Sequence, residues 1–540
     1  MKNAILFHIF LLCICCMACT GTTKEPVADV TLDELPSIFP DYADVTIPPH
    51  IAPLRFRLSE PGDEAIAVLS CGNEKMITAA STDGQFLFPE KEWNKLLDKA
   101  VGKDIDVKVY RREKNEWQSY PTFLWHVSAD PIDEYLVYRL IEPGYELWNK
   151  MGIYQRHITD YEQTPIIENS LTNHNCMNCH SFCRQDPEKM LFHMRAELPG
   201  TYIINGKSVE KLDTKAGEKV QSLVYPSWHP SGNFVAFSVN NTRQAFHMND
   251  KNRIEVYDLS SDVVVYDVNK HEVVTDSLIF SDKAFETFPT FSPDGKTLYF
   301  CSAQAKEIPK DFKSVKYSLC SISFDPETRR FGHQVDTLYS SEQATVQITG
   351  AEHKSASFPR VSPDGKQLVF TLSEYGNFSI WHKDADLYRI DLDSGVMHRM
   401  DEVNSDDVES YHSWSSNSRW LVFSSRRIDG LYTRPYLVHI DENGKTGKPF
   451  VLPQEDPDFY SRFMFSYNIP EFVKGKVEAE VHTIADTARK PGNRIRMGNN
   501  TDRQKARVNR YSSYSQKHSH YRRFCEIGGV AIVPIADYYF

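Results

Sequence analysis

This chain lacks most of the short motifs that mark a familiar enzyme active site. It has no Gly-x-Ser-x-Gly nucleophile turn, no His-Glu-x-x-His zinc motif and no glycine-rich loop of the kind that holds phosphates. Beyond residue 19, it also has no apolar run long enough to cross a bilayer. The sequence therefore gives no support to those catalytic classes or to a fold of several membrane-spanning helices.

Cysteine is scarce and unevenly placed. Of the 11 cysteines, four lie within residues 1–19, three lie between positions 176 and 183, and the other four are scattered along the chain. A secreted protein that depends on disulfides normally shows a more even framework. The cluster at 176–183 therefore indicates a site and not a set of cross-links.

A net positive charge is also missing. The formal charge of −12 argues against non-specific binding of nucleic acid by the whole surface, and no nucleic-acid partner is predicted. Between Ala488 and Cys525 the balance reverses, with eleven Lys or Arg residues against one acid, Asp502. We interpret residues 476–540 as a basic tail with little order. Contact with anionic lipid or nucleic acid is the alternative for this stretch, although no nucleic-acid fold motif surrounds it.

Residues 1–19 have the pattern of a bacterial export signal. Lys2 precedes the apolar run "AILFHIFLLCICCMA", and polar residues follow. Ordinary cleavage after "CMA" is one interpretation. We favour a lipoprotein signal in which Cys19 is lipidated, because the segment resembles a relaxed lipobox with Cys16 in place of the usual leucine. "TGTTKE" after Cys19 lacks the acidic cluster typical of surface export. The expected location is thus the periplasmic face of a membrane, by preference the outer membrane.

The region before the cysteine cluster has a β pattern. Residues 20–47 are a polar linker, and residues 48–145 contain short alternating runs such as "EAIAVLSC", "DIDVKVYRR" and "EYLVYRLI", separated by Gly, Pro and Asp. One helix is predicted over "EKEWNKLLDKAVG", which ends in Gly102. The pattern predicts an N-terminal β-sandwich of immunoglobulin or fibronectin type, with a role in support or docking.

The second half carries an internal repeat. Four segments start with an aromatic residue and pass through a tight turn into an apolar strand: "YPSWHPSGNFVAFS" from Tyr225, "FPTFSPDGKTLYFC" from Phe288, "FPRVSPDGKQLVFT" from Phe358 and "YHSWSSNSRWLVFS" from Tyr411. Proline and Asp-Gly suit such a turn, although the last repeat has lost both proline and glycine. The "SPDGK" turns followed by "LYF" or "LVF" resemble the TolB-type, WD-like β-propeller family. That resemblance implies a propeller of about 5–6 blades over residues 201–475 and implies no activity.

Cys176-Met-Asn-Cys179-His180 has the spacing of a c-type haem attachment site. Two thiols at this spacing can reach the two vinyl groups of one porphyrin, while the adjacent histidine presents its imidazole to the iron. Haem c is attached outside the cytoplasm, where the export signal would direct the chain. We predict a short helical segment, residues 146–200, that carries one covalent haem c on Cys176 and Cys179, with His180 as the proximal iron ligand.

The second axial position would decide what such a haem does. "DPEKMLFHMR" is predicted as a short helix after Pro187 that places Met190 and His193 on one face, so either is a candidate distal ligand. Further candidates are His174, His229 and His247. A methionine ligand would suit electron transfer, whereas an empty position would allow peroxide chemistry, so whether the chain is an enzyme stays open.

Other interpretations of the cluster also stay open. A zinc ion could be held by Cys176, Cys179 and Cys183 together with His180 or His193. A local disulfide, for instance between Cys179 and Cys183, is a third possibility. If haem is present, Arg184 and Arg195 are candidates to pair with its propionates, although simple solvated charge explains them equally well.

The segments "PIDEYLVYRLIEPGYELWNKMGIYQRHITDY", "NCMNCHSF" and "YPSWHPSGN" resemble a group of exported bacterial proteins that join a haem segment to a TolB-like propeller. The resemblance implies a haem-bearing envelope protein and supplies no reaction. The favoured function is electron transfer by a membrane-anchored monohaem protein, whose propeller docks a redox or envelope partner. One alternative is an envelope scaffold or binding propeller with structural zinc or a disulfide. The other is a haem enzyme with an open axial site.

Overall fold

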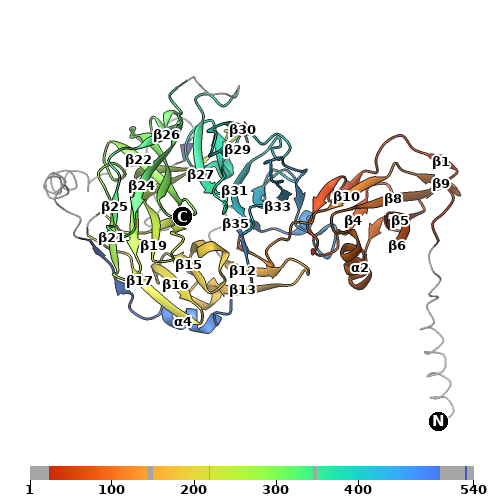
Figure 1. The fold of residues 1–540 in the computed structure, drawn as a ribbon, viewed down its shortest axis with the longest axis horizontal. Coiled ribbons are helices and arrows are strands. Elements are labelled where there is room, and N and C mark those ends of the chain that lie inside the picture. Colours follow the sequence, from red (N-terminus) through yellow and green to blue (C-terminus); the bar gives the residue numbers. More distant parts are fainter. Residues whose placement is uncertain (1–23, 143–149, 218, 344–349, 499–529, 532–540) are drawn as a thin grey trace, which may run out of the picture.

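The computed structural model describes residues 24–142, 150–217, 219–343, 350–498 and 530–531. Two β-rich parts lie side by side: a large propeller and a smaller N-terminal domain attached at its edge (Figure 1). Cys19, the predicted lipidation site, lies outside the described residues. Within the described ranges, no helix is both long and apolar enough to span a membrane.

The N-terminal domain contains two sheets and one helix. The larger sheet consists of β1 (Val30–Thr31), β3 (Val45–Ile47), β5 (Glu64–Cys71), β6 (Glu74–Ser81), β8 (Asp104–Glu113), β9 (Glu116–Ser119) and β10 (Phe123–Val127). The smaller consists of β2 (Ile38–Phe39), β4 (Phe56–Leu58) and β7 (Gln85–Phe86). Helix α2 (Glu90–Ala100) confirms the predicted helix and buries Trp93, Leu96 and Leu97. The immunoglobulin-like arrangement stays a prediction.

Six sheets of the described residues form a β-propeller, which confirms the propeller predicted for the second half of the chain. The innermost strands of the sheets neighbour one another in a closed ring. Blade 1 is β14 (Met177–Phe182), β15 (Lys189–Met194), β16 (Gly200–Asn205) and β17 (Ser208–Asp213); blade 2 is β18 (Val224–Trp228), β19 (Phe234–His247), β20 (Ile254–Asp267) and β21 (Glu272–Val274). Blade 3 is β22 (Ala284–Phe291), β23 (Thr297–Gln304), β24 (Ser318–Asp325), β25 (Arg330–Phe331) and β26 (Asp336–Tyr339).

The last three blades complete the ring. Blade 4 is β27 (Ser355–Val361), β28 (Gln367–Ser373), β29 (Asp386–Asp391) and β30 (Met397–Arg399); blade 5 is β31 (Glu409–Trp414), β32 (Trp420–Ser425), β33 (Arg434–His439) and β34 (Phe450–Val451). Blade 6 is β35 (Ser466–Val473), β11 (Tyr135–Ile141), β12 (Met151–His157) and β13 (Gln163–Glu168). Short helices lie between these strands: η1 (Asn169–Leu171), η2 (Cys183–Gln185), η3 (Phe312–Ser314), η4 (Ser379–Trp381) and α3 (Phe459–Arg462).

Blade 6 joins the two ends of the propeller sequence. Its innermost strand, β35, comes from the C-terminal side and pairs antiparallel with β11, which the sequence pattern had placed in the N-terminal domain. Arg139 and Asn468, 329 residues apart in sequence, hydrogen-bond across this pair at 3.0 Å. The apolar, alternating sequence of β11 suits a strand of the N-terminal domain as well as a strand of blade 6. Its assignment therefore depends on pairing with β35, which the local sequence does not reveal.

The segment that carries Cys176 is a blade and not a short helical unit. The predicted helix after Pro187 is instead the strand β15, hydrogen-bonded between β14 and β16. Met190, Phe192 and Met194 point to one side of this strand and Leu191 and His193 to the other. Because both faces of the strand are buried, its sequence shows no clear alternation, which is why a helix was expected.

Part of the predicted basic tail packs on the propeller. Helix α4 (Val481–Ala488) buries Ile484 and Ala488 in the core between blades 6 and 1. After it, β36 (Asn493–Arg494) pairs with β17, and β37 (Arg496–Met497) pairs with β21. The short strand β38 (Val530–Ala531) pairs with β19. The other residues after position 498 lie outside the described part of the chain.

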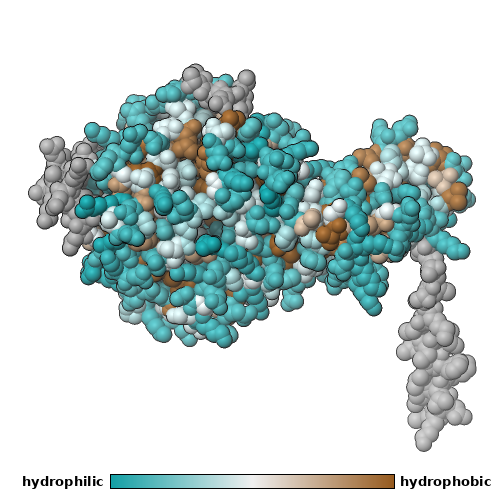
Figure 2. All heavy atoms as spheres, in the orientation of Figure 1, coloured by the Kyte–Doolittle hydropathy of each residue, from teal (hydrophilic) through white to brown (hydrophobic). Residues whose placement is uncertain are grey.

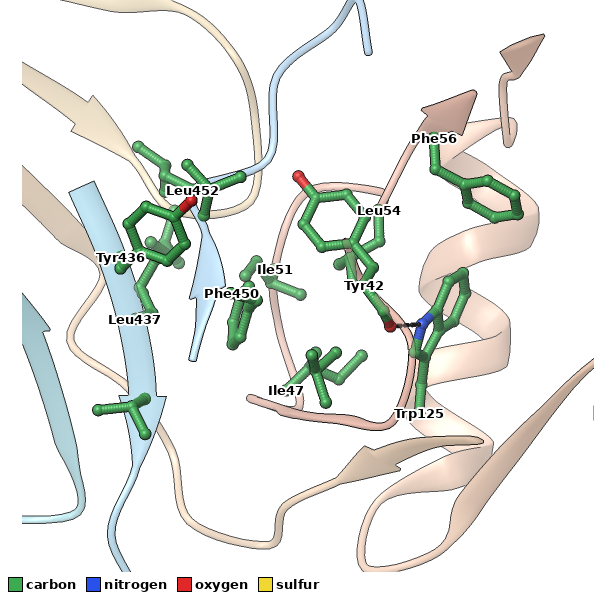
Figure 3. Packing of buried hydrophobic residues seen from close by; sticks show 14 of the residues in the cluster. Tyr42, Ile47, Ile51, Leu54, Phe56, Trp125, Tyr436, Leu437, Phe450 and Leu452 are labelled. Carbon is green, nitrogen blue, oxygen red and sulfur yellow. Dashed lines mark hydrogen bonds between the residues drawn. The ribbon is translucent and has the colours of Figure 1, made fainter. Parts of the chain in front are cut away.

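The N-terminal domain docks on blade 5 through one continuous apolar core. Tyr42, Ile51 and Leu54 face Phe450 and Leu452 across this contact (Figure 3). On the face drawn in Figure 2, hydrophobic residues are scattered among hydrophilic ones and do not form one broad patch. On this face, the described chain leaves no broad apolar surface exposed.

Candidate functional site

Every innermost strand of the propeller has a β-bulge at the same position. The pairing register slips there in all six blades, and the residue at the slip has a positive φ of 48–55°. These residues are Cys179, Tyr225, Phe288, Phe358, Tyr411 and Ile469. A positive φ is uncommon outside glycine, so its recurrence shows that the six positions are structurally equivalent.

This equivalence shows which part of the propeller the Cys-x-x-Cys-His segment forms. Aligned on the bulge, the six blades have "CHSF", "YPSW", "FPTF", "FPRV", "YHSW" and "IPEF". Cys179-His180 therefore takes the place of an aromatic residue and proline, and it matches Tyr411-His412 of blade 5 most closely. The end of the predicted haem motif is one copy of the propeller repeat.

His180 lies where His412 lies in blade 5, but its ring nitrogens are less well satisfied. Nε2 of His412 lies 2.9 Å from the carbonyl oxygen of Val369, in the second strand of the preceding blade. The backbone carbonyls of Val137 and Ile469 in blade 6 lie near the ring of His180, but neither of its buried ring nitrogens has a hydrogen-bond partner among the described residues. Burial lowers the pKa of each histidine to about 3, so both are neutral at pH 7. His180 is 2% exposed, so its imidazole is enclosed by the surrounding strands.

The two thiols of the motif are also enclosed. Cys176 and Cys179 are each 5% exposed, and burial raises the pKa of both. Together with His180 they line neither of the two cavities described below. A covalent haem needs both thiols and one imidazole to face a shared open space. The residues as placed in this structure do not fit that group.

The predicted distal ligands do not converge with His180 on a common point. Met190 lies opposite Phe182 in the core shared with blade 6. His193 points to the other face of β15, where its Nδ1 lies 3.2 Å from Oγ1 of Thr201. Burial lowers the pKa of His193 to about 3. Met190 and His193 point to opposite faces because the segment is a strand. Residues three positions apart lie on one face only in a helix.

The predicted zinc ligands are separated too. Cys183 is buried in the core facing blade 2, with its Sγ 3.8 Å from the carbonyl oxygen of His229, whereas Cys176 is buried in the core facing blade 6. Across the described ranges, no three His, Cys, Asp or Glu side chains are grouped so that they could hold a metal ion. Cys176, Cys179 and Cys183 are free thiols in the structure, without the local disulfide.

The haem prediction can be tested directly on the mature protein. Protein made in the periplasm with the haem maturation machinery is expected to give no pyridine haemochrome band, because the motif residues are enclosed by β15 and blade 6. A c-type cytochrome made in the same cells is the positive control. A band that is present in the native chain and absent from a Cys176→Ala/Cys179→Ala variant would show instead that the motif binds haem.

A cavity of about 400 Å³ lies where the innermost strands end, at one mouth of the propeller axis. All six blades contribute to it. Its lining includes one equivalent residue from each blade, in chain order Ser181, Ser227, Thr290, Arg360, Ser413 and Glu471. These residues come two positions after the bulge, where the repeat has Ser or Thr in four blades. The arginine of "FPRV" and the glutamate of "IPEF" stand out at this position. The repeat itself therefore contained the signal for this site, although the spacing motif of Cys176 drew attention elsewhere.

The charges in this mouth cavity are mostly positive. Arg184, Arg360 and Lys474 line it, together with Asp364 and Glu471. Burial raises the pKa of Glu471 to about 8, against the opposing effect of Arg360. Its Oε2 accepts a hydrogen bond from the backbone N–H of Phe182 at 3.2 Å. At pH 7 Glu471 is therefore largely neutral, and three cations face one charged carboxylate.

Of the three cations in the mouth cavity, Arg360 is the one that lies in an innermost strand. Its Nη1 donates a hydrogen bond to the carbonyl oxygen of Pro359 at 3.0 Å, and it has no carboxylate at ion-pair distance in the part of the chain that the structure describes. Asp364, in contrast, accepts hydrogen bonds from Ser362 and from the backbone of Lys366. The guanidinium of Arg360 thus keeps donors free for a bound group.

A second cavity, of about 420 Å³, differs in character from the mouth cavity. Blades 2, 3 and 4 line it, and four of its charged residues form two ion pairs. Lys313 contacts Asp250 at 2.7 Å, and Lys251 contacts Glu374 at 3.1 Å. Because these four charges are already neutralised in pairs, they are less available to a ligand.

Comparisons with known proteins identify no family for this chain. No family model matches the chain, and no curated protein matches it. Solved structures similar to it include the β-propeller domain of the Trilobed protease from Pyrococcus furiosus, at 10% identity over 57% of this chain and 79% of that one, with a TM-score of 0.30. An oligogalacturonate lyase from Vibrio parahaemolyticus matches at 10% identity over 57% and 92%, with a TM-score of 0.29. The Cps50 (Swd1) propeller domain from Myceliophteria thermophila matches at 10% identity over 54% and 70%, with a TM-score of 0.29. The class assigned to this chain, a six-bladed β-propeller, depends on its own strand pairings.

Proposed function

We propose that this chain is a ligand-binding β-propeller of the bacterial cell envelope, which binds an anionic small molecule or chain end in the mouth cavity. The observation that carries the proposal is the convergence of all six blades on one cavity with an excess of cations. A volume of about 400 Å³ lies within the range of small-molecule sites. Hydrogen bonds from guanidinium groups to anionic oxygens are among the strongest that proteins make.

The envelope location is part of the same proposal. It is supported by the export pattern of residues 1–19 and by the lipidation pattern at Cys19. The N-terminal domain, for which a sandwich is predicted over residues 48–145, would then support the propeller beside the membrane, docked on blade 5 as observed. Electron transfer would require the covalent haem that the motif residues do not fit, so that alternative depends on the haemochrome result.

Replacing Arg360 by glutamine is expected to weaken anion binding by about tenfold to a hundredfold. The reason is that a hydrogen bond to a charged group is worth about 1.5–3 kcal/mol, and 1.4 kcal/mol is a factor of ten. Calorimetric titration with glucuronate, citrate, glucose 6-phosphate and sulfate measures the effect. Lys366→Gln is the matched control, because Lys366 is exposed in the same turn region and does not line the cavity.

The pH profile gives this experiment an internal check. Affinity is expected to fall as pH rises through about 8, because deprotonation of Glu471 then adds a negative charge beside Arg360. A raised pKa also means that the folded state holds a proton more tightly, so the stability from this group declines between its ordinary value of 4.5 and about 8. Glu471→Gln should flatten both profiles. Equal affinities for the native chain and Arg360→Gln would refute the proposed site.

A further inference from the structure

The mouth cavity is lined by two rings of equivalent residues at different depths. The inner ring is the set from Ser181 to Glu471 described above, which lies within the innermost strands, two positions after the bulge. The outer ring lies five positions after the bulge, where the chain has left each of these strands. It also lines the cavity and consists of Arg184, Pro230, Pro293, Pro363, Ser416 and Lys474. The outer ring therefore forms the rim of the cavity, and the inner ring forms the wall below it.

The two rings carry their positive charges on different sides of the propeller axis. The cation of the inner ring is Arg360, in blade 4. In the outer ring, the proline of the repeat is replaced by Arg184 in blade 1 and by Lys474 in blade 6, which are neighbouring blades. Both residues are exposed, and neither has an ion-pair partner among the described residues. Because blade 1 lies opposite blade 4 in a ring of six, the cavity has one cationic position in its wall and another on the far side of its rim.

The turn that carries Arg184 is held in an unusual backbone conformation. Arg184 has a φ of 55° and a ψ of 39°, and Gln185 has a φ of 57°, so two successive residues other than glycine lie in the left-handed region. This conformation costs free energy and is concentrated at functional sites. Contacts with two other blades maintain it: Nε2 of Gln185 donates to the carbonyl oxygen of Trp414 at 3.2 Å, and the carbonyl oxygen of Gln185 accepts from the backbone N–H of Lys474 at 2.9 Å. The strained turn thus fixes the backbones of the two rim cations beside each other.

The acids beside the outer ring are already engaged in hydrogen bonds. Asp133 accepts from the backbone N–H and the hydroxyl of Ser416, at 2.7 and 2.6 Å. Asp364 accepts from Ser362 and from the backbone of Lys366, at 2.6 and 3.1 Å. In the part of the chain that the structure describes, neither acid lies at ion-pair distance from a rim cation. The rim therefore keeps its positive charge available to a ligand.

The wall between the two cationic positions offers hydroxyl groups. Oγ of Ser227 accepts a hydrogen bond from the backbone N–H of Phe291 at 3.1 Å, so its own O–H is left to donate. Oγ of Ser413 donates to the carbonyl oxygen of Pro470 at 2.8 Å, so its lone pairs are left to accept. A ligand that carries hydroxyl groups can satisfy both.

From this arrangement we infer that the mouth cavity selects a small hydroxylated molecule with two anionic groups, one bound by Arg360 in the wall and the other by Arg184 and Lys474 on the rim. The inference rests on the function proposed above and names the class of ligand. The planar fork of arginine matches carboxylate and phosphate oxygens. A cavity of about 400 Å³ is large enough for a six-carbon diacid.

Calorimetric titration at low ionic strength with glucarate, gluconate and adipate tests the inference, because all three have a six-carbon chain. Glucarate has two carboxylates and several hydroxyl groups, gluconate has one carboxylate, and adipate has two carboxylates without hydroxyl groups. The native chain is expected to bind glucarate about tenfold more tightly than either of the others, since each ion pair on the rim contributes up to about fivefold and each hydroxyl adds a hydrogen bond. A titration with fructose 1,6-bisphosphate distinguishes phosphate from carboxylate as the preferred anionic group.

Variants of the rim separate this inference from the function on which it rests. Arg184→Asn removes one rim cation, and asparagine tolerates the left-handed backbone, so the turn keeps its shape. Combined with Lys474→Gln, it should abolish the preference for glucarate over gluconate and leave the affinity for gluconate unchanged. Lys366→Gln, which lies outside the cavity, should keep the native preference.

Two results would overturn the inference and leave the proposed function standing. One is a native chain that binds gluconate through Arg360 but binds glucarate no better than two carboxylates give by statistics. The other is a double variant that keeps the native preference for glucarate. If neither gluconate nor glucarate binds the native chain, both the inference and the proposed function fail.

Discussion

Replacing Tyr467 by alanine is expected to lower the free energy of unfolding by about 3–5 kcal/mol, the range seen when a large buried aromatic side chain is removed. Tyr467 lies in β35, the strand that closes the propeller, and it is 1% exposed. Its ring is 4.8 Å from that of Tyr138 in β11, the strand with which β35 pairs. The substitution therefore leaves a void at the junction between the two ends of the propeller sequence.

Urea unfolding followed by tryptophan fluorescence measures this change. Met464→Ala is the matched control, because Met464 is 64% exposed just before the same strand and should change stability by less than about 0.5 kcal/mol. If both variants unfold at the urea concentration of the native chain, then β35 does not close the ring in solution.

A Trp125→Ala substitution should cost a comparable amount, about 3–5 kcal/mol, but in the N-terminal domain. Trp125 is fully buried, and its ring lies 5.6 Å from that of Trp93. Its Nε1 donates to the carbonyl oxygen of Tyr42 at 2.8 Å, as Figure 3 shows. The ring of Tyr42 in turn contacts Phe450 of blade 5, with centroids 6.5 Å apart. Loss of Trp125 should thus both destabilise the domain and loosen its docking.

Limited proteolysis combined with thermal unfolding separates these two effects. The variant is expected to lose the N-terminal domain to protease at a concentration that leaves the propeller intact. His126→Ala is the control, because His126 is the next residue in β10 and its side chain is 44% exposed. A Trp125→Ala protein as resistant as this control would mean that the apolar core in Figure 3 does not hold the domain in place.

Local sequence was sufficient to predict the propeller. Each repeat contains an aromatic residue, a tight turn and an alternating strand within fourteen residues, as in "FPTFSPDGKTLYFC", so neighbouring residues determine these hairpins. The two further blades were predicted with less detail. Their innermost strands are "CHSF" and "IPEF", in which a cysteine and an isoleucine replace the aromatic residue. Without the aromatic residue the similarity is weak, and "CHSF" also completes a familiar cofactor motif.

The candidate site was likewise only partly predictable from the sequence. Arg360 and Glu471 occupy equivalent positions of two repeats and are 111 residues apart in sequence. An alignment of all six repeats would have drawn attention to both. Their joint placement in one cavity, and the raised pKa of Glu471, could not be predicted. Both depend on the ring of blades, which brings the ends of the six innermost strands together and removes Glu471 from water.

The sequence by itself therefore determined that the chain is mostly β, that four repeats are propeller hairpins and that residues 90–102 contain a helix, because those features depend on neighbours along the chain. Only the tertiary structure decided that Cys179 and His180 belong to an innermost strand, that β11 closes the ring with β35, and that Arg360 and Glu471 line one cavity. A spacing motif such as Cys-x-x-Cys-His states which side chains are near in sequence. Whether they share an open space depends on strand direction, burial and the neighbouring blade, which only the assembled propeller supplies.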